Sequence, residues 1–362
     1  MQNALSGQFP AAFSPPTTDV GDLPQFWASF NNAPRRIQDA GWARQVTQAD
    51  FAVAESVSGV NMRLDAGGIR ELHWHLAAEW AIVTYGTCRV TTIDPAGRTY
   101  VADVGAGDLW YFPSGYPHAL QGLGPDGAEF ILCFDDGKQG EFNTLLVTDW
   151  MAHLPPGILA SNFGVPEAVF GRIPTHDLYI FQGQLPGPLK ADQAEVRSAE
   201  MPPNPFTFRL AGGPKAKQSK GGFIQIADSA NFKAASTVAA ALVTVHPGGM
   251  RELHWHPNAD EWQYYVKGSA EMGVFNAGPK AVTTNFNAGD IGYIKRSLGH
   301  FVKNVGNTDL VFLEVFAANA YQDVALSEWL THTPAQMVTA HFSIPADALA
   351  KFPRNAPGVV PA

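Results

Sequence analysis

Short stretches rich in β-branched and aromatic residues recur along the chain, and Gly, Pro or Asp stands at their ends. Such stretches predict short strands separated by turns. Because many short strands must bury their inner faces and protect their edges, the pattern predicts an all-β fold of jelly-roll-like barrels. The stretches include AIVTYGTCRVTTID (81–94), DLWYFP (108–113), EFILCFD (129–135), QYYVKGSAEMGVF (263–275), IGYIKR (291–296) and LVFLEVF (310–316).

The pattern of the first half is repeated in the second half. GGIRELHWH (67–75) returns as GGMRELHWH (248–256), and AGDLWYFPSGYPH (106–118) returns as AGDIGYIKRSLGH (288–300). Because the matching segments keep the same order along the chain, we predict two tandem barrels related by internal duplication.

Helix signals and turn-rich stretches complete the predicted domain plan. A short helical segment is expected to close each barrel, with Thr148 and Ser327 as the N-cap residues. Stretches rich in Pro and Gly predict the connections outside the barrels. The plan is an N-terminal arm (1–35), a first barrel domain (36–185), an interdomain connection (186–222) and a second barrel domain (223–362).

Composition limits the classes of function. The 362 residues suffice for two buried cores, and 35 Gly, 27 Pro and 16% charged residues fit a turn-rich β protein. A formal net charge of -9 makes nucleic acid an unfavourable partner. No segment resembles a membrane span or a signal peptide, so we expect a cytoplasmic protein with no membrane partner, or a secreted one if a leader was trimmed. Cys88 and Cys133 are expected to be small buried side chains and imply no disulfide framework.

Each half carries three histidines and one glutamate at matching positions. Because alternate residues of a strand face the same side, His73 and His75 should point together, as should His254 and His256. The other histidines (His153, His176, His246, His332 and His341) lack this pattern. The two predicted metal-ligand sets are His73, His75, Glu79 and His118, and His254, His256, Glu261 and His300.

Three imidazoles and one carboxylate favour a divalent transition metal. Four ligands would fill a tetrahedral zinc ion. On an octahedral manganese or iron ion they would leave two adjacent positions for water, substrate or dioxygen. We favour manganese because the carboxylate shifts the preference toward harder ions, and iron stays open.

These regions resemble the signature motifs of the cupin superfamily. Residues 67–86 and 248–268 satisfy the first motif, whereas Gly122, Lys295 and Ser297 depart from the second motif outside its ligands. More narrowly, RELHWH in both halves, GVNMRL, GDLWYFPSG, FDDG and the TDW segment resemble the bicupin oxalate decarboxylases. This resemblance covers nearly the whole chain after the arm.

The resemblance implies conversion of oxalate to formate and carbon dioxide, with manganese in both barrels and dioxygen needed for turnover. It also implies a homo-oligomer, either a trimer or a hexamer of two stacked trimers. An oxalate oxidase that yields hydrogen peroxide is the first alternative. A non-enzymatic metal-binding or storage bicupin and a bicupin dioxygenase also stay open, because one fold supports many activities.

Arg70 and Arg251, each three residues before a ligand histidine, would orient the carboxylate substrate. An odd offset points a side chain to the opposite face of a regular strand. We therefore expect a bulge near Gly67 and Gly68 to aim Arg70 inward.

The segment 138–144 matches the lid of the family, and Glu141 on it would accept and return the proton. Its sequence GEFNT differs from the usual Ser-Glu-Asn-Ser-Thr, which bears on the choice between decarboxylase and oxidase. Glu314 matches a glutamate near the second metal. Trp74 and Trp255 are expected to serve packing, with electron transfer between subunits as the alternative.

Overall fold

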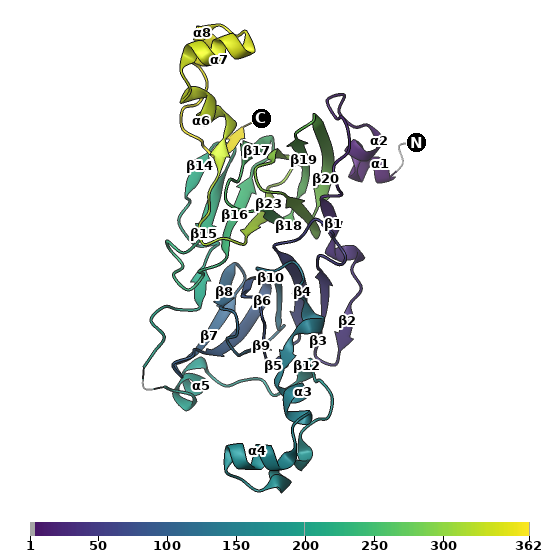
Figure 1. The fold of residues 1–362 in the computed structure, drawn as a ribbon, viewed down its shortest axis with the longest axis vertical. Coiled ribbons are helices and arrows are strands. Elements are labelled where there is room, and N and C mark those ends of the chain that lie inside the picture. The colour runs from purple at the N-terminus through teal and green to yellow at the C-terminus, as the bar shows by residue number, and fades with distance from the viewer. Residues whose placement is uncertain (1–3, 199, 362) are drawn as a thin grey trace.

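The computed structural model describes residues 4–198 and 200–361. Two β-barrels lie one above the other along the long axis, and short helices project from the far end of each barrel (Figure 1). The predicted fold class, two tandem jelly-roll-like barrels each closed by a short helical segment, is confirmed.

The first barrel is one sheet of 12 strands. Its central strand β6 (Glu79–Ile93) pairs with β10 and β8 through its first half and with β7 and β9 through its second half, so it joins the two faces of the barrel. The other strands are β2 (Arg36–Gln38), β3 (Gly41–Val46), β4 (Ser58–Leu64), β5 (Gly68–Trp74), β7 (Thr99–Gly105), β8 (Asp108–Phe112), β9 (His118–Gly122), β10 (Ala128–Phe134), β11 (Leu145–Leu146), β12 (Ile180–Gln182) and β13 (Thr207–Arg209).

The second barrel consists of two sheets, because the strand that matches β6 is divided at Gly268 into β18 and β19. One sheet contains β1 (Trp27–Ser29), β14 (Lys217–Ser219), β15 (Gly222–Ala227), β16 (Ala239–Val245), β18 (Glu261–Lys267), β21 (Asp290–Ile294) and β23 (Leu310–Phe316). The other contains β17 (Gly249–Trp255), β19 (Ser269–Asn276), β20 (Lys280–Asn287), β22 (Gly299–Asn304), β24 (Val324–Ala325) and β25 (Val359–Pro361).

The helices α3 (Val147–Ala152) and α6 (Leu326–Thr331) close the two barrels. Thr148 and Ser327 lie inside the first turns of these helices, so the predicted N-caps are wrong. Each hydroxyl instead bonds a glutamate on the neighbouring strand: Thr148 donates to Glu71, and Ser327 makes the matching bond in the second barrel.

The remaining helical segments lie outside the barrels. Within residues 4–198 and 200–361, no helix is long and apolar enough to cross a membrane. The segments are α1 (Ala4–Gln8), α2 (Pro10–Phe13), η1 (Phe30–Asn32), η2 (Glu141–Asn143), α4 (Pro156–Phe163), η3 (Glu167–Arg172), α5 (Leu189–Glu195), α7 (Ala335–Phe342) and α8 (Ala346–Leu349).

The N-terminal arm packs against the second barrel, although it precedes the first barrel in sequence. Strand β1 pairs with β21, and the amide of Ala11 donates to Asn285 Oδ1 at 2.8 Å. In the interdomain connection, β13 pairs with β8 of the first barrel and β14 pairs with β15 of the second. The exact boundaries of the domain plan stay predictions.

One hydrophobic core extends across both barrels. Trp80 and Tyr111 of the first barrel are buried in the same cluster as Trp262 and Tyr293 of the second. Gly59 makes room for this packing, since a Cβ atom there would lie 2.4 Å from the ring of Trp262. The interface between the barrels is therefore a packed core.

Gly59→Ala is expected to lower the thermal midpoint of unfolding, because the added methyl group overlaps the Trp262 ring. Overpacking of this kind costs about 1–3 kcal/mol. Gly171→Ala is the control, since nothing lies within 4 Å of a Cβ atom at that position. Equal midpoints for the two variants, measured by calorimetry, would contradict the close packing of Trp262 against Gly59.

Candidate metal centres and lid

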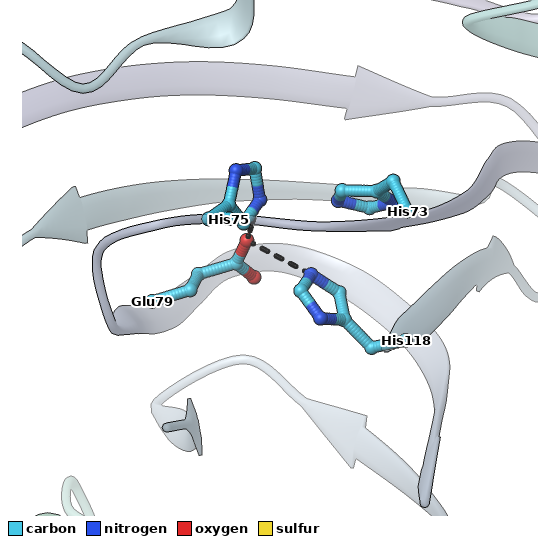
Figure 2. Close-up of side chains that lie close together, drawn as sticks. All are labelled: His73, His75, Glu79 and His118. Carbon is cyan, nitrogen blue, oxygen red and sulfur yellow. Dashed lines mark hydrogen bonds and ion pairs between the residues drawn. The ribbon is translucent and has the colours of Figure 1, made fainter. Parts of the chain in front are cut away.

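The first predicted ligand set converges inside the first barrel. His73 on β5 lies opposite His118 on β9 in the strand register, His75 directly follows β5, and Glu79 begins β6. One potential ligand atom of each residue lies within 4.8 Å of the others, and all four residues are buried. Figure 2 shows the Glu79 carboxylate between His75 and His118, with His73 alongside.

The second predicted set forms a matching cluster inside the second barrel. Its ligand atoms come from β17, β18, β22 and the turn after β17, are buried and also lie within 4.8 Å of one another. The structure thus brings together all eight predicted residues, the second four being His254, His256, Glu261 and His300.

An irregular step in β5 aims Arg70 inward. The pairing of β5 with β9 shifts register between Arg70 and His73, so both side chains are buried while Leu72 between them is 56% exposed. The predicted bulge therefore exists, but its expected place near Gly67 and Gly68 is wrong. Strand β17 has the same irregularity between Arg251 and His254.

Backbone carbonyl groups fix the orientation of five of the six ligand imidazoles, the exception being His75, whose Nδ1 lies 3.4 Å from the Thr144 hydroxyl. His73 Nδ1 donates to the carbonyl of Glu71 at 2.5 Å, and His118 Nδ1 donates to that of Tyr116 at 2.8 Å. Because a carbonyl only accepts, a neutral ring then keeps its Nε2 lone pair for the centre of the cluster. In the second barrel, Nδ1 atoms of His254, His256 and His300 donate to the carbonyls of Glu252, Gln322 and Leu298 at 2.6, 2.6 and 3.0 Å.

Buried acceptor atoms face one another at the second cluster. Glu261 Oε2 lies 2.9 Å from His300 Nε2 and 3.3 Å from His256 Nε2. Among the described residues, none of these atoms has a hydrogen-bond partner, and neither does His254 Nε2. Buried lone pairs and a carboxylate are costly without a cation between them. The donor set therefore fits a divalent transition metal.

Electrostatics keeps His73 and Glu79 in the form that a metal requires. Burial, followed by Arg70 and the neighbouring imidazoles, holds the pKa of His73 well below its usual range. Burial alone would raise the pKa of Glu79, but His118 and His75 outweigh it and leave that pKa below its ordinary value. A neutral imidazole and an ionised carboxylate are the metal-binding forms.

A hydrogen bond anchors each ligand carboxylate, and the two barrels supply it differently. Trp110 Nε1 donates to Glu79 Oε1 at 2.7 Å. In the second barrel, Gln263 Nε2 donates to Glu261 Oε1 at 2.8 Å. Gly292 stands at the position that matches Trp110, and a Cβ atom there would lie 2.9 Å from Gln263 Oε1. The sequence did not single out Trp110 or Gln263.

The lid, residues 138–144, places Glu141 beside the first cluster. Glu141 is only 5% exposed, and its Oε2 accepts from Arg70 Nη2 at 3.0 Å and from the Tyr179 hydroxyl at 2.9 Å. The Glu141 amide donates to Gln45 Oε1 at 2.9 Å. Lid, arginine and tyrosine therefore form one buried network in the structure.

Arg251 is held more tightly in the second barrel. Its Nε donates to Glu314 Oε1 at 3.3 Å, and its Nη2 donates to Asp323 Oδ2 at 2.7 Å. The Tyr321 hydroxyl donates to Glu314 Oε2 at 3.1 Å. Two carboxylates thus pair with Arg251, whereas among the described residues Arg70 forms an ion pair only with Glu141.

Comparisons with known proteins agree with this geometry. The cupin family model matches residues 28–169 and 210–348. Oxalate decarboxylase OxdC of Bacillus subtilis is 49% identical over 94% of this chain and 88% of that protein. A probable oxalate decarboxylase of Arthroderma benhamiae is 36% identical over 94% of this chain and 84% of its own length. A solved structure of a mutant of the B. subtilis enzyme has a TM-score of 0.96 at 46% identity, covering 99% of this chain and 94% of that chain.

The chain belongs to the bicupin oxalate decarboxylase family. Another solved structure, which concerns the Mn(II) centres of the B. subtilis enzyme, also has a TM-score of 0.96 at 46% identity and covers 99% of this chain and 94% of that chain. The family assignment therefore rests on sequence and on fold across both barrels.

Other predicted residues of this bicupin lie away from the clusters. Trp74 packs against Trp150, with ring centroids 5.7 Å apart, and Trp255 packs against Trp329 at 5.9 Å. Both free cysteines are buried, as expected. Within the described residues, the five remaining histidines join neither group of potential metal ligands.

Trp110→Phe is expected to weaken metal retention in the first barrel by about 10–100-fold, because it removes the donor that orients Glu79. Trp80→Phe is the matched control: Trp80 is also fully buried, but within the described chain its Nε1 has no hydrogen-bond partner. Metal content after dialysis against a graded chelator measures the effect. If both variants lose metal equally, the Trp110 bond has no orienting role.

Proposed function

We propose that this bicupin is an oxalate decarboxylase that converts oxalate to formate and carbon dioxide, with manganese in both clusters and dioxygen as co-catalyst. The observation that carries the proposal is the buried Arg70–Glu141 pair beside the first ligand set. The oxalate decarboxylases of B. subtilis and A. benhamiae, 49% and 36% identical to this chain, support it.

Four residues in each barrel would bind one manganese ion. In the first barrel these are His73, His75, Glu79 and His118, and the matching four residues serve the second barrel. When bound, manganese together with dioxygen would supply the one-electron oxidation that cleavage of the oxalate carbon–carbon bond requires.

Arg70 would bind the substrate, and Glu141 would transfer the proton. The guanidinium of Arg70 can bind a carboxylate through two parallel N–H donors, and it lies in a buried site where that interaction is strong. Glu141 accepts the proton of hydrogen oxalate and returns one to carbon after carbon dioxide leaves. One proton thus moves from oxygen to carbon, and formate and carbon dioxide are the balanced products.

The first barrel is the better candidate for turnover. When the lid moves, Arg70 releases Glu141 and binds the substrate instead. Arg251 keeps its bonds to Glu314 and Asp323. Glu314 lies on strand β23 and is fully buried, so it has no comparable movement. We therefore assign catalysis to Arg70 and Glu141, and a supporting role to Arg251 and Glu314.

Oxalate oxidase is the second candidate, and the lid composition is the observation that favours it. Phe142 on the lid is 73% exposed. If the lid opened before protonation, the reaction would favour hydrogen peroxide over formate, because a closed lid excludes water and holds the acid. The retained Glu141 favours the decarboxylase.

We also propose a homo-oligomer, either a trimer or a hexamer, in the cytoplasm. The helices that project from the barrels carry large exposed apolar side chains, which commonly mark interfaces between subunits. These residues are Trp150, Ile158, Phe163, Trp329, Met337 and Phe342.

Glu141→Gln is expected to lower formate production from ¹³C-oxalate by about 10²–10⁴-fold, because the amide cannot accept the proton. Its metal content should equal that of the unmodified protein. Glu314→Gln is the comparison from the second barrel and should retain most formate production.

Formate and hydrogen peroxide are measured together in this experiment. Formate output unaffected by Glu141→Gln would remove Glu141 from the mechanism. Stoichiometric peroxide from the unmodified protein would identify the oxidase instead.

A further inference from the structure

A cavity of about 450 Å³ lies against the lid of the first barrel. Glu141, Phe142 and Tyr179 form one part of its wall. Three guanidinium groups, those of Arg35, Arg36 and Arg44, form another part. No role assigned above uses this cavity or these arginines.

We propose that this cavity is a binding site for carboxylates, which we call the anteroom. Arg35, Arg36 and Arg44 would bind oxalate there before the lid opens and oxalate moves to Arg70. This inference rests on the proposed function. The site would bind a small dicarboxylate through charge-assisted hydrogen bonds to guanidinium groups, as Arg favours.

Two of the arginines are held close together by one aromatic ring. The guanidinium carbon of Arg35 lies 4.6 Å from the centroid of the Trp42 ring, and that of Arg44 lies 5.3 Å from it. Burial and then the positive charge of Arg35 lower the pKa of Arg44. Like charges in such an arrangement repel one another, and an anion between them would relieve the repulsion.

The described carboxylates near these two cations do not pair with them directly. Among the described residues, neither Arg35 nor Arg44 forms an ion pair. Arg44 Nε donates to the neutral Asn61 side chain at 2.9 Å, and Glu129 lies beyond that amide, 3.0 Å from Asn61 Nδ2. Two carboxylates lie in the cavity wall itself: Asp50, whose Oδ2 accepts from the Thr47 amide and hydroxyl, and Glu141, which is paired with Arg70.

Arg36 connects the cavity to the metal side of the lid. Its guanidinium carbon lies 3.7 Å from the centroid of the buried Tyr179 ring, and its Nη2 pairs with Asp177 Oδ2 at 2.6 Å. The guanidinium carbon of Arg70 lies 4.3 Å from the same ring. Arg36 and Arg70 therefore contact the same ring, and in this proposal a carboxylate passes from Arg36 to Arg70 when Glu141 moves.

The anteroom would offset the repulsion between this negatively charged protein and its anionic substrate. Its formal net charge is -9, so the average field of the molecule repels an oxalate dianion. A local group of cations in a partly enclosed wall raises the anion concentration at the lid. This effect precedes the chemical step, so it would change the binding of substrate and not the rate of bond cleavage.

The kinetic test removes two cations from the wall. The double variant Arg35→Gln/Arg44→Gln is expected to lower kcat/KM for oxalate about tenfold through a higher KM. Arg209→Gln/Arg354→Gln is the matched control, because both residues are exposed, lie outside the cavity wall and give the same change in net charge. The difference should shrink as ionic strength rises. Equal losses in the two double variants would overturn the proposal.

A binding test separates this inference from the proposed function. Crystals of the manganese-loaded protein soaked in iodide should show an anomalous peak between the Arg35 and Arg44 guanidinium groups, and the Arg35→Gln/Arg44→Gln crystals should lack it. This readout is independent of decarboxylation. A protein inactive on oxalate that still shows the peak would overturn the proposed function and retain an anion site. A protein active on oxalate without the peak would overturn the anteroom alone.

Discussion

The crowding of buried acceptor atoms is the constraint on which each barrel depends. Nδ1 of five of the six ligand histidines is bound to a backbone carbonyl, so Nε2 of each neutral ring has no proton to share with the ligand glutamate. At the second cluster, Glu261 Oε2 lies 2.9 Å from His300 Nε2. Such a centre is costly in a protein interior unless a cation satisfies it, which links the folding of the barrel to metal binding.

Duplication preserved this centre while the surroundings diverged. Arg70 is bound to a glutamate on a short lid, whereas Arg251 is bound to Glu314 on a core strand and to Asp323. The same ligand chemistry therefore stands beside a carboxylate on a short loop segment in one barrel and a carboxylate on a core strand in the other. This difference, rather than the ligands themselves, is the basis on which we propose turnover in the first barrel.

Strand periodicity and the repeat were enough to predict the fold and all eight ligand residues: periodicity aligns the histidines within one strand, and strand pairing across the barrel brings His118 and His300 to them. The N-caps at Thr148 and Ser327 were wrong, since buried glutamates from strands that are distant in sequence but adjacent in space bond those hydroxyls. Tyr179 could not be predicted, because its contact with Glu141 depends on how the segment before β12 returns to the barrel. The residues that anchor the ligand carboxylates could have been found by comparing the two repeats. Where the first repeat has Ala81 and Trp110, the second repeat has Gln263 and Gly292.

The central claim is that each barrel grips one redox-capable ion through three imidazoles and a carboxylate. Elemental analysis of the purified protein, combined with electron paramagnetic resonance, tests it most directly. The account predicts up to two manganese ions per chain in six-coordinate sites that retain positions for small ligands. A single equivalent of zinc, or a coordination sphere filled entirely by protein atoms, would contradict it.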